Sequence, residues 1–538
     1  MPNHARSIVV CDDITFSWPD GTEVLYDISV AFGPRRTGLV GANGVGKTTL
    51  LKLIAGLYSP TSGSITVSGS VGYLPQHLTL ETHKTVADLL GIGTQIDALA
   101  AIESGDVDPR HFDAIGQDWD IAARARAALD DMGLIDIDLA RTVGTLSGGE
   151  SILIALAGLQ LGDHDVLLLD EPTNNLDRET RASLYETISR WSGTLIIVSH
   201  DVTLLDLMDN TAELHTGSLT TFGGNYSAYM DYRQQEQAAL EQALRTAEQN
   251  LKTEKRQRIE AETKLSRRKR FGNKAFENKR EPKMIMNLRK QQAQVSAGKL
   301  RDEADTKVTV AREEVHELSE KVRTDKHIRI NLPDPEVHNL RRLVEFQQPD
   351  ARPIIIQGSE RVAITGRNGI GKTRLIERLL GNNHSETTVI AATSYTDRIG
   401  YLPQRLDHLD DEVTVLDAVR MAAPLAKLEH IRAQLARFLF RADTVQQKIG
   451  KLSGGERFRV ALALLLLAEP PNELLILDEP TNNLDLKTIQ EFIEALNTYE
   501  GALIVVSHDD VFLRQINIDT WLHLDADGLQ RGDGPSGS

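Results

Sequence analysis

The chain has 538 residues, a formal net charge of −17 and one cysteine, Cys11. This length predicts two or three domains, and a single cysteine excludes an internal disulfide and a cysteine-based zinc site, which suits a reducing compartment. The longest apolar run, 460–468, is far shorter than the roughly 20 residues that span a bilayer, and the first residues lack the apolar core of a signal peptide. We therefore expect a cytoplasmic protein whose membrane contacts, if any, come through another chain.

Positive charge is concentrated in one segment. Residues 251–300 hold 16 Lys or Arg against 5 Asp or Glu, so this block carries +11 and the remaining residues carry −28. Such an asymmetry indicates a polyanionic partner for the block rather than for the whole protein.

One set of motifs occurs twice. The segment GANGVGKTT at 41–49 returns as GRNGIGKTR at 366–374, and YLPQ, LSGGE, DEPTNNLD and VSHD follow in the same order in both halves. Apolar runs before these motifs predict buried parallel strands that alternate with helices, so the expected fold class is α/β. From Gln76 to LSGGE there are 71 residues, and from Gln404 there are 49, which predicts an additional helix or loop in the first half.

The glycine-rich loops are candidate phosphate-binding loops. A G-x-x-x-x-G-K-T segment between a strand and a helix cradles phosphates with main-chain N–H groups, its lysine reaches the β- and γ-phosphates, and its threonine offers a hydroxyl to Mg²⁺. A lone match can be a glycine-rich turn without chemistry, but the second copy makes that alternative a minor one. The candidate nucleotide-binding residues are Gly41, Asn43, Gly44, Gly46, Lys47, Thr48, Thr49, Gly366, Asn368, Gly369, Gly371, Lys372, Thr373 and Arg374.

Acidic residues and histidines follow the buried strands of each half. An aspartate ends one strand, where it can orient the Mg²⁺ shell, and the glutamate after it can polarise an attacking water. A histidine ends the next strand and can contact the γ-phosphate; a lone histidine there is more often structural, but the same register in both halves favours the functional interpretation. The residues are Asp170, Glu171 and His200 in the first half and Asp478, Glu479 and His508 in the second.

The LSGGE segments are the most diagnostic motif. A serine followed by two glycines at a helix start presents a hydroxyl and open N–H groups, which suits an anion that arrives from outside the same half. The simpler interpretation, an ordinary helix N-cap, is compatible with this one. The residues are Ser147, Gly148, Gly149, Ser453, Gly454 and Gly455.

In this order, the motifs resemble those of the ATP-binding cassette superfamily. The resemblance implies an ATP hydrolase that uses ATP and Mg²⁺, with two cassettes head to tail and each ATP between the phosphate loop of one and the LSGGE signature of the other. It pairs the first site's Lys47, Gln76, Glu171 and His200 with Ser453 and Gly455, and the second site's Lys372, Gln404, Glu479 and His508 with Ser147 and Gly149. It adds Gln76 and Gln404 as Mg²⁺ ligands beside Thr48, Asp170, Thr373 and Asp478, and Asp177 and Asp485 as ATP-site residues.

The two sites differ in two respects. Trp18 lies where the family places an aromatic residue that stacks on adenine, although an aromatic residue in a β-rich segment is often core. The second half offers only Phe346 as a weak candidate. The first signature continues with Ser151 where the second has Arg457, so the second nucleotide is expected to turn over differently, although both sites retain their loops and glutamates.

A long helical segment joins the two cassettes. Apolar residues at helical spacing around Leu244 and Ala311 predict two antiparallel helices, with a basic tip near 267–290 between them. A charged hairpin is usually a solvated spacer, but one-signed charge with interleaved apolar side chains fits insertion into folded RNA. The candidate RNA contacts are Arg267, Arg268, Lys269, Arg270, Phe271, Lys274, Phe276, Lys279, Arg280 and Lys283.

The whole chain resembles the ABC-F group of tandem-cassette proteins. The expected domains are 1–228 and 325–538 for the two ATPase cassettes and 229–324 for the linker. The resemblance implies a monomeric ATPase that binds the ribosome, with ribosomal RNA and P-site tRNA as possible contacts, and that places the linker near the tRNA exit site and the peptidyl-transferase centre. Housekeeping members of this group often carry a large arm in the first cassette, and the 22 extra residues here are too few for a full arm. The resemblance therefore favours antibiotic protection over a housekeeping or rescue role. A drug-exporter subunit and a DNA-repair ATPase are the alternatives from other classes.

Overall fold

The computed structural model describes residues 8–534. The gaps lie at 77, 79–82, 175, 216, 278–282, 322–333, 350, 382–389, 405, 407, 439, 441–443, 483 and 533, and the side chains of 272–277, 283–290, 293, 320 and 321 are not described. The chain divides into two compact units, Met1–Ser227 with His327–Ser538, and Ala228–Lys326. The first unit holds both cassettes and the second holds the linker helices.

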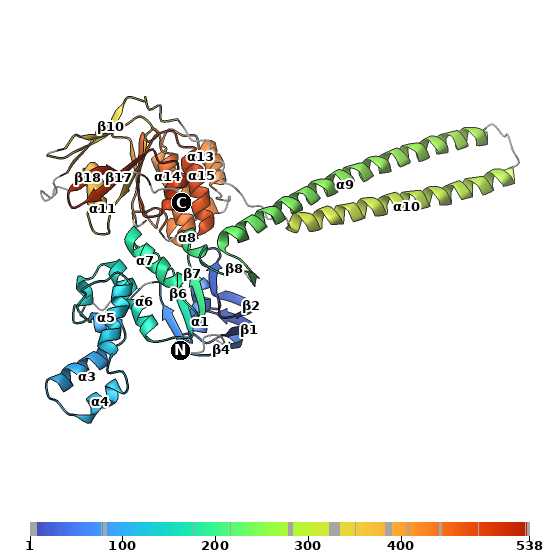
Figure 1. Ribbon diagram of the computed structural model, residues 1–538. Coiled ribbons are helices and arrows are strands. Elements are labelled where there is room, and N and C mark those ends of the chain that lie inside the picture. The colour runs from blue at the N-terminus through green and yellow to red at the C-terminus, as the bar shows by residue number, and fades with distance from the viewer. Residues whose placement is uncertain are drawn as a thin grey trace. The chain divides into compact units, whose positions relative to one another are not determined.

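Each cassette contains one small antiparallel sheet and one large, mainly parallel sheet (Figure 1). In the first cassette the strand orders are β2-β1-β4 and β5-β6-β7-β3-β8-β9, and only the β8–β9 pair of the large sheet is antiparallel. The strands are β1 Val9–Ser17, β2 Glu23–Phe32, β3 Arg36–Val40, β4 Ser62–Val67, β5 Val71–Leu74, β6 Val166–Asp170, β7 Thr194–Val198, β8 Asn210–His215 and β9 Ser218–Phe222.

The second cassette repeats this topology. Its orders are β11-β10-β13 and β14-β15-β16-β12-β17-β18, again parallel except for the last pair. The strands are β10 Arg342–Gln347, β11 Ile354–Gln357, β12 Arg361–Thr365, β13 Ala391–Ser394, β14 Ile399–Leu402, β15 Leu474–Asp478, β16 Ala502–Val506, β17 Thr520–Asp525 and β18 Gly528–Gly532. The predicted α/β class and the predicted parallel strands are confirmed.

The large sheets are buried on both faces, which explains their continuous apolar sequences. All five residues of β6 are buried. Val166 and Leu168 pack into the core beside β1 and β2, whereas Leu167 and Leu169 pack into the core on the other face, because successive side chains of a strand point to opposite sides. A strand that must be apolar on both faces loses the alternating pattern of a half-exposed strand.

Helices cover the sheets and carry the length difference between the cassettes. Between Gln76 and Ser147 the first cassette contains α2, α3, α4 and α5, whereas the described residues between Gln404 and Ser453 form α12 and α13. The expected additional helix is therefore confirmed, and α3 and α4 pack on each other. The first cassette's helices are α1 Lys47–Ile54, α2 Val86–Leu89, α3 Gly93–Glu103, α4 Pro109–Ile115, α5 Ile121–Asp131, α6 Gly148–Leu161, α7 Arg178–Ser189 and α8 Val202–Leu205. The second cassette's are α11 Lys372–Leu379, α12 Val415–Ala422, α13 Leu428–Arg437, α14 Gly454–Leu466, α15 Leu486–Asn497 and α16 Asp510–Gln515, with 3-10 turns at Val143–Thr145, Thr444–Gln446 and Ile449–Lys451.

The linker unit is an antiparallel pair of long helices, α9 Tyr226–Glu277 and α10 Lys283–Lys321 (Figure 1). Ala247 of α9 and Val308 and Ala311 of α10 are buried, as the helical spacing predicts. Arg258 of α9 pairs with Asp305 of α10 at 2.6 Å, which fixes the register of the two helices.

The tip predicted over 267–290 is mostly helical, which corrects the sequence interpretation. Helix α9 continues through Gly272 to Glu277, and α10 begins at Lys283. A glycine inside a helix costs about 1 kcal/mol, but the arginines, lysines and alanine around it are good helix formers. Pro282 directly precedes Lys283 in the sequence, and proline is well tolerated at a helix start. Within the described part of the chain, no helix is long and apolar enough to cross a membrane.

Candidate functional site

The first phosphate loop connects the carboxyl end of β3 to the start of α1. Gly46 caps α1 with a left-handed backbone, φ 108°, and Gly41 has φ 150°. A Cβ atom on Gly41 would lie 2.4 Å from the main-chain oxygen of Leu214, so no other residue fits there without a shift. Lys47 is buried, and its ammonium donates to the carbonyls of Gly41 at 2.7 Å and Ala42 at 3.2 Å.

The second phosphate loop repeats this geometry between β12 and α11. Gly371 caps α11 with φ 109°, and Gly366 approaches the main-chain oxygen of Leu524 as Gly41 approaches Leu214. Lys372 donates to the carbonyl of Gly366 at 2.6 Å. Arg374 is exposed, whereas Thr49 at the matching position is buried. Each lysine is therefore held over a ring of main-chain groups, where it can exchange a carbonyl for a phosphate oxygen.

The predicted Mg²⁺ residues fit a hard cation. Asp170 is buried at the end of β6, and neither of its carboxylate oxygens has a hydrogen-bond partner among the described residues. In the second cassette, the hydroxyl of Thr373 donates to Asp478 at 2.8 Å. Burial raises the pKa of both aspartates. A divalent cation would relieve that burial penalty and take the oxygen ligands it prefers.

The two candidate catalytic glutamates share an unusual backbone. Glu171 has φ +50° and Glu479 has φ +48°, a left-handed conformation that costs a non-glycine residue free energy and clusters at functional sites. Both side chains are buried or nearly so. Burial raises the pKa of Glu171 to about 8 and that of Glu479 to about 7. Both values lie close to neutral pH, where a general base is most effective.

The two histidines face different partners. Nε2 of His200 lies 3.2 Å from Oδ1 of Asn43 and 3.1 Å from Oε1 of Glu171. Nε2 of His508 lies 2.8 Å from Nζ of Lys372 and 3.5 Å from Oε1 of Glu479. Burial lowers the pKa of each histidine to about 3, so both are neutral at pH 7. Each histidine therefore faces the glutamate of its own site, but its second neighbour is an amide in the first site and a lysine in the second.

These residues of the first cassette line one cavity of about 420 Å³. Trp18 lies at its rim, 37% exposed, with its ring edge-on to Phe16 and Tyr58 at centroid distances of 5.1 and 5.7 Å. Val24, Asn174 and Val198 also line it and were missed by the sequence analysis, although Asn174 belongs to the repeated DEPTNNLD segment. The lining residues are Trp18, Val24, Asn43, Gly44, Gly46, Lys47, Thr48, Thr49, Gln76, Asp170, Glu171, Asn174, Val198 and His200.

The weak candidate for an adenine platform in the second cassette is wrong. Phe346 has no exposed surface and packs in the core, as does Phe16 at the matching position of β1. The residue that follows each strand is the true counterpart: Trp18 after β1 and Gln348 after β10. Gln348 exchanges two hydrogen bonds with the main chain of Leu529, at 2.7 and 2.9 Å. The second site therefore has a fixed amide where the first has an indole.

The aspartates of the NNLD segments contact the opposite phosphate loops. Asp485 caps α15 and accepts from the main-chain N–H of Asn43 at 3.0 Å. Asp177 caps α7 and accepts from the main-chain N–H of Asn368 at 3.4 Å. The contacts are reciprocal, so each site receives one aspartate from the other cassette.

Both signature serines cap helices. Ser147 and Glu150 form a capping box at α6, and Ser453 and Glu456 form one at α14, as the N-cap interpretation predicts. A Cβ atom on Gly148 or Gly454 would meet nothing within 4 Å, so one side of each helix start is open. The described lining of the 420 Å³ cavity contains no signature residue of the second cassette, so the sandwich of each ATP between loop and signature stays a prediction.

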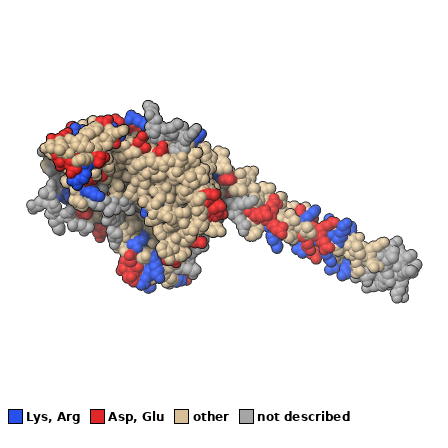
Figure 2. Space-filling view, turned by 90° about the horizontal axis from the view of Figure 1, so that it is seen from below, with Lys and Arg blue, Asp and Glu red and all other residues tan. Residues whose placement is uncertain are grey.

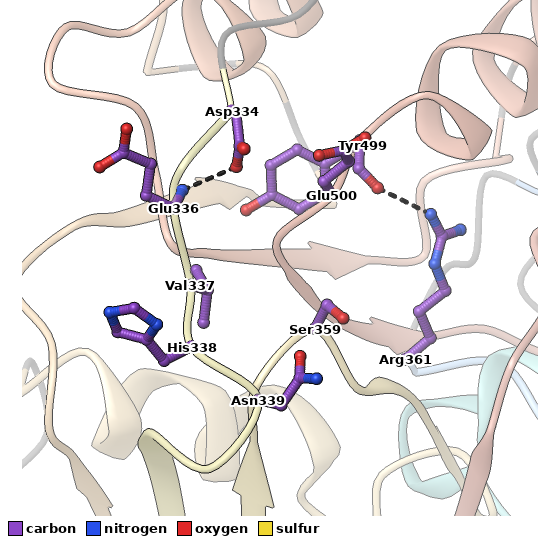
Figure 3. A pocket seen from close by; sticks show the side chains of 9 residues that line it. All are labelled: Asp334, Glu336, Val337, His338, Asn339, Ser359, Arg361, Tyr499 and Glu500. Carbon is purple, nitrogen blue, oxygen red and sulfur yellow. Dashed lines mark hydrogen bonds between the residues drawn. The ribbon is translucent and has the colours of Figure 1, made fainter.

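A second cavity, of about 630 Å³, lies in the second cassette (Figure 3). Arg361 stands at the amino end of β12, whereas the phosphate loop follows its carboxyl end, so this cavity lies at the opposite edge of the sheet from the nucleotide loop. The guanidinium of Arg361 donates to the carbonyls of Leu496, Tyr499 and Ile516. The guanidinium therefore binds carbonyls at or just after the ends of α15 and α16, and these hydrogen bonds occupy it in place of a ligand.

Part of the predicted RNA-contact set can be placed. Arg267, Arg268, Lys269 and Arg270 lie on α9 with exposed side chains, and Phe271 is 75% exposed. The side chains of Lys274, Phe276 and Lys283 lie outside the described residues, as do Lys279 and Arg280.

Comparison with known proteins places the chain. The ABC transporter family profile matches residues 27–174 and 354–482. The chain is 31% identical to the tylosin resistance ATP-binding protein TlrC of Streptomyces fradiae, over 91% of this chain and 92% of that protein. It is 30% identical to ABC transporter F family member 5 of Arabidopsis thaliana, over 92% of this chain and 72% of that protein. The chain belongs to the ABC-F family.

A solved structure has a similar fold. The archaeal ribosome recycling factor aABCE1, in complex with the ribosomal stalk protein aP1, matches with a TM-score of 0.55 and 20% identity, over 96% of this chain and 87% of that one. This likeness concerns the fold. As members of the ATP-binding cassette superfamily, the two cassettes of this ABC-F protein bind ATP, and the protein is an ATP hydrolase.

Proposed function

We propose that this ABC-F protein binds the ribosome in its ATP-bound, closed form and protects it against antibiotics. In this proposal the linker enters from the tRNA exit site, and its basic residues contact ribosomal RNA near the peptidyl-transferase centre. ATP hydrolysis then opens the cassettes and releases the protein.

The charge of the linker supports an RNA partner. Figure 2 shows basic and acidic side chains interspersed along the linker helices. At Arg267–Arg270 four exposed basic residues follow one another, and the ring of Phe271 beside them is 75% exposed. A phenylalanine exposed to water contributes no stability through burial, but its ring can pack on an unstacked base while the arginines bind phosphates.

The extent of similarity favours protection over a housekeeping role. The match to TlrC, whose name states tylosin resistance, covers 92% of that protein, whereas the match to the Arabidopsis F family member covers 72%. The chain therefore matches almost the whole length of the resistance protein. A translation regulator or rescue factor of the same family is the alternative. A drug-exporter subunit is less well supported, because such a role leaves the basic linker without an anionic partner.

Hydrolysis can be assigned to the residues that surround each loop. Lys47 and Lys372 would exchange main-chain carbonyls for β- and γ-phosphate oxygens, and Thr48 with Asp170, or Thr373 with Asp478, would hold Mg²⁺. The bound ion neutralises charge on the phosphates. Glu171 and Glu479 would accept the proton of the attacking water, since their raised pKa places them near neutrality. His200 and His508 would orient the γ-phosphate as neutral donors or acceptors.

Sedimentation with ribosomes tests the proposal. The double variant Glu171→Gln/Glu479→Gln should retain ATP and stay closed, because a general base contributes about 10²–10⁴-fold to the rate. We expect it to pellet with 70S ribosomes in ATP but not in its absence. If the trapped protein does not bind ribosomes, the proposed partner is wrong.

A matched pair of linker variants locates the contact. Neutralising Arg267, Arg268, Lys269 and Arg270 to Gln in the trapped protein should abolish pelleting. Neutralising Arg245, Lys252, Lys255 and Arg256 removes the same charge from exposed positions of the same helix. The control should still pellet with ribosomes, and its binding should weaken only by the amount expected from the lost charge. Translation assays with added macrolide, in the presence of the wild-type protein, then separate protection from the housekeeping alternative.

A further inference from the structure

Helices α7 and α15, which follow the two NNLD segments, carry different residues at matching positions near the other cassette. Counting from the capping aspartates, Arg181 of α7 corresponds to Ile489 of α15. Ile489 packs against the core of its own cassette. Arg181 instead reaches the second cassette, so the two nucleotide sites receive different residues from their partners.

Arg181 contacts the main chain of a candidate γ-phosphate residue. Its Nη1 donates to the carbonyl oxygen of His508 at 3.3 Å, and its side chain is 14% exposed. The same Nη1 lies 3.8 Å from Oδ2 of Asp201, which also accepts from the hydroxyl of Tyr185. Asp201 is thus held without Arg181, whereas no other side chain among the described residues is seen to donate to the carbonyl of His508.

The charge of Arg181 also acts on the second site's glutamate. Oε1 of Glu479 lies 3.5 Å from Nε2 of His508, and the guanidinium of Arg181 contacts the carbonyl of the same histidine, so its positive charge lies in the cluster that holds the glutamate. At the first site the equivalent residue, Ile489, packs in the core of its own cassette and brings no charge. A buried cation near the attacking water and the γ-phosphate stabilises both the ionised base and the charge that develops in phosphoryl transfer.

We propose that Arg181 is a positioning residue that the first cassette supplies to the second nucleotide site, where it holds the His508 segment and favours hydrolysis there. The first site has no equivalent, because Ile489 can neither donate a hydrogen bond nor carry charge. The proposal rests on the assigned role of Glu479 but not on the ribosome as partner. If Glu171→Gln/Glu479→Gln retained full turnover, the role of the glutamates and the proposal for Arg181 would both fail, whereas a failure to bind ribosomes would leave the proposal for Arg181 intact.

Single-site backgrounds test the asymmetry. In Glu171→Gln only the second site turns over, and there Arg181→Ile should lower kcat roughly tenfold, as loss of one charge-assisted hydrogen bond does, with little change in KM. Arg181→Lys, which keeps the cation, should restore most of the rate, and Arg181→Gln should restore less. In Glu479→Gln, Arg181→Ile should change kcat by no more than about twofold.

The control is a neighbouring ion pair of the same helix. Arg178 pairs with Asp510 of the second cassette at 2.9 Å, but it is 63% exposed and touches no site residue. Arg178→Leu, which copies Leu486, should change either background by no more than about twofold, since an exposed pair contributes little. Equal losses in Arg178→Leu and Arg181→Ile, equal losses in both backgrounds, or no loss in Glu171→Gln would each overturn the proposal.

Discussion

Nε2 of His508 accepts a hydrogen bond from the ammonium of Lys372 at 2.8 Å. At the first site the equivalent nitrogen of His200 lies 3.2 Å from Oδ1 of Asn43 instead, although each histidine also faces the glutamate of its own site. The same sequence motif therefore produces two electrostatically different sites. The difference should be measurable in each site's response to pH, to base-stacking changes and to backbone substitution.

The two sites should have different pH profiles. A raised carboxyl pKa means that the base form appears only at higher pH, so activity is absent below that pKa and rises through it. In Glu171→Gln, kcat/KM should rise with a midpoint near 7, from Glu479; in Glu479→Gln the midpoint should be near 8, from Glu171. Steady-state ATPase assays between about pH 5.5 and 9.5 measure both. A common midpoint would contradict the assignment of these glutamates as bases.

Trp18 should matter to one site only. Trp18→Ala in the Glu479→Gln background should raise KM for ATP by about tenfold, because stacking of a base on an aromatic ring is worth about 1–3 kcal/mol. The same substitution in Glu171→Gln should leave KM unchanged, since Gln348 occupies the equivalent place in the second cassette. Trp18→Phe serves as control and should retain most of the affinity. If Trp18 only packs on Phe16 and Tyr58, both backgrounds will lose stability equally and KM will not separate them.

Gly41 should not tolerate a side chain. Gly41→Ala places a Cβ atom 2.4 Å from the carbonyl oxygen of Leu214 at a left-handed φ of 150°, so we expect a loss of about 1–3 kcal/mol in the free energy of unfolding and of ATP binding. Chemical denaturation and nucleotide titration measure the two effects. Gly33→Ala is the control, because a Cβ atom there meets nothing within 4 Å. Equal stability of the two variants would contradict the strained geometry.

A buried carboxylate should stabilise the second cassette only while it is paired. The side chain of Glu473 has no exposed surface and pairs with Arg341 and Arg398, and the hydroxyl of Thr396 donates to it at 2.6 Å. Arg341→Met/Arg398→Met should cost about 3–5 kcal/mol, because it leaves a charge buried without partners. Adding Glu473→Met should recover most of that loss. Denaturant melts of the double and triple variants decide this, and a triple variant no more stable than the double would show that the charge is not the cause.

Much of the architecture could be predicted because it depends on local pattern. The five-residue apolar strand before Asp170, the glycine loop that begins α1 at Lys47 and the capping box at Ser147 each need only neighbouring residues to form. A strand buried on both faces must be apolar throughout, and a helix start must satisfy its own N–H groups, so these rules can be read along the chain. Duplication then located both nucleotide sites.

The tertiary structure decided what depends on residues far apart in the chain. Phe346 is excluded as an adenine platform because its strand turns it into the core, and only strand register identifies Gln348 as the partner of Trp18. The contact of Arg181 with His508 spans 327 residues, and no local pattern encodes it. Long-range contacts of this kind arise from packing, so the sequence predicted two ATP sites and a difference between them, whereas only the tertiary structure placed Arg181 against the second site.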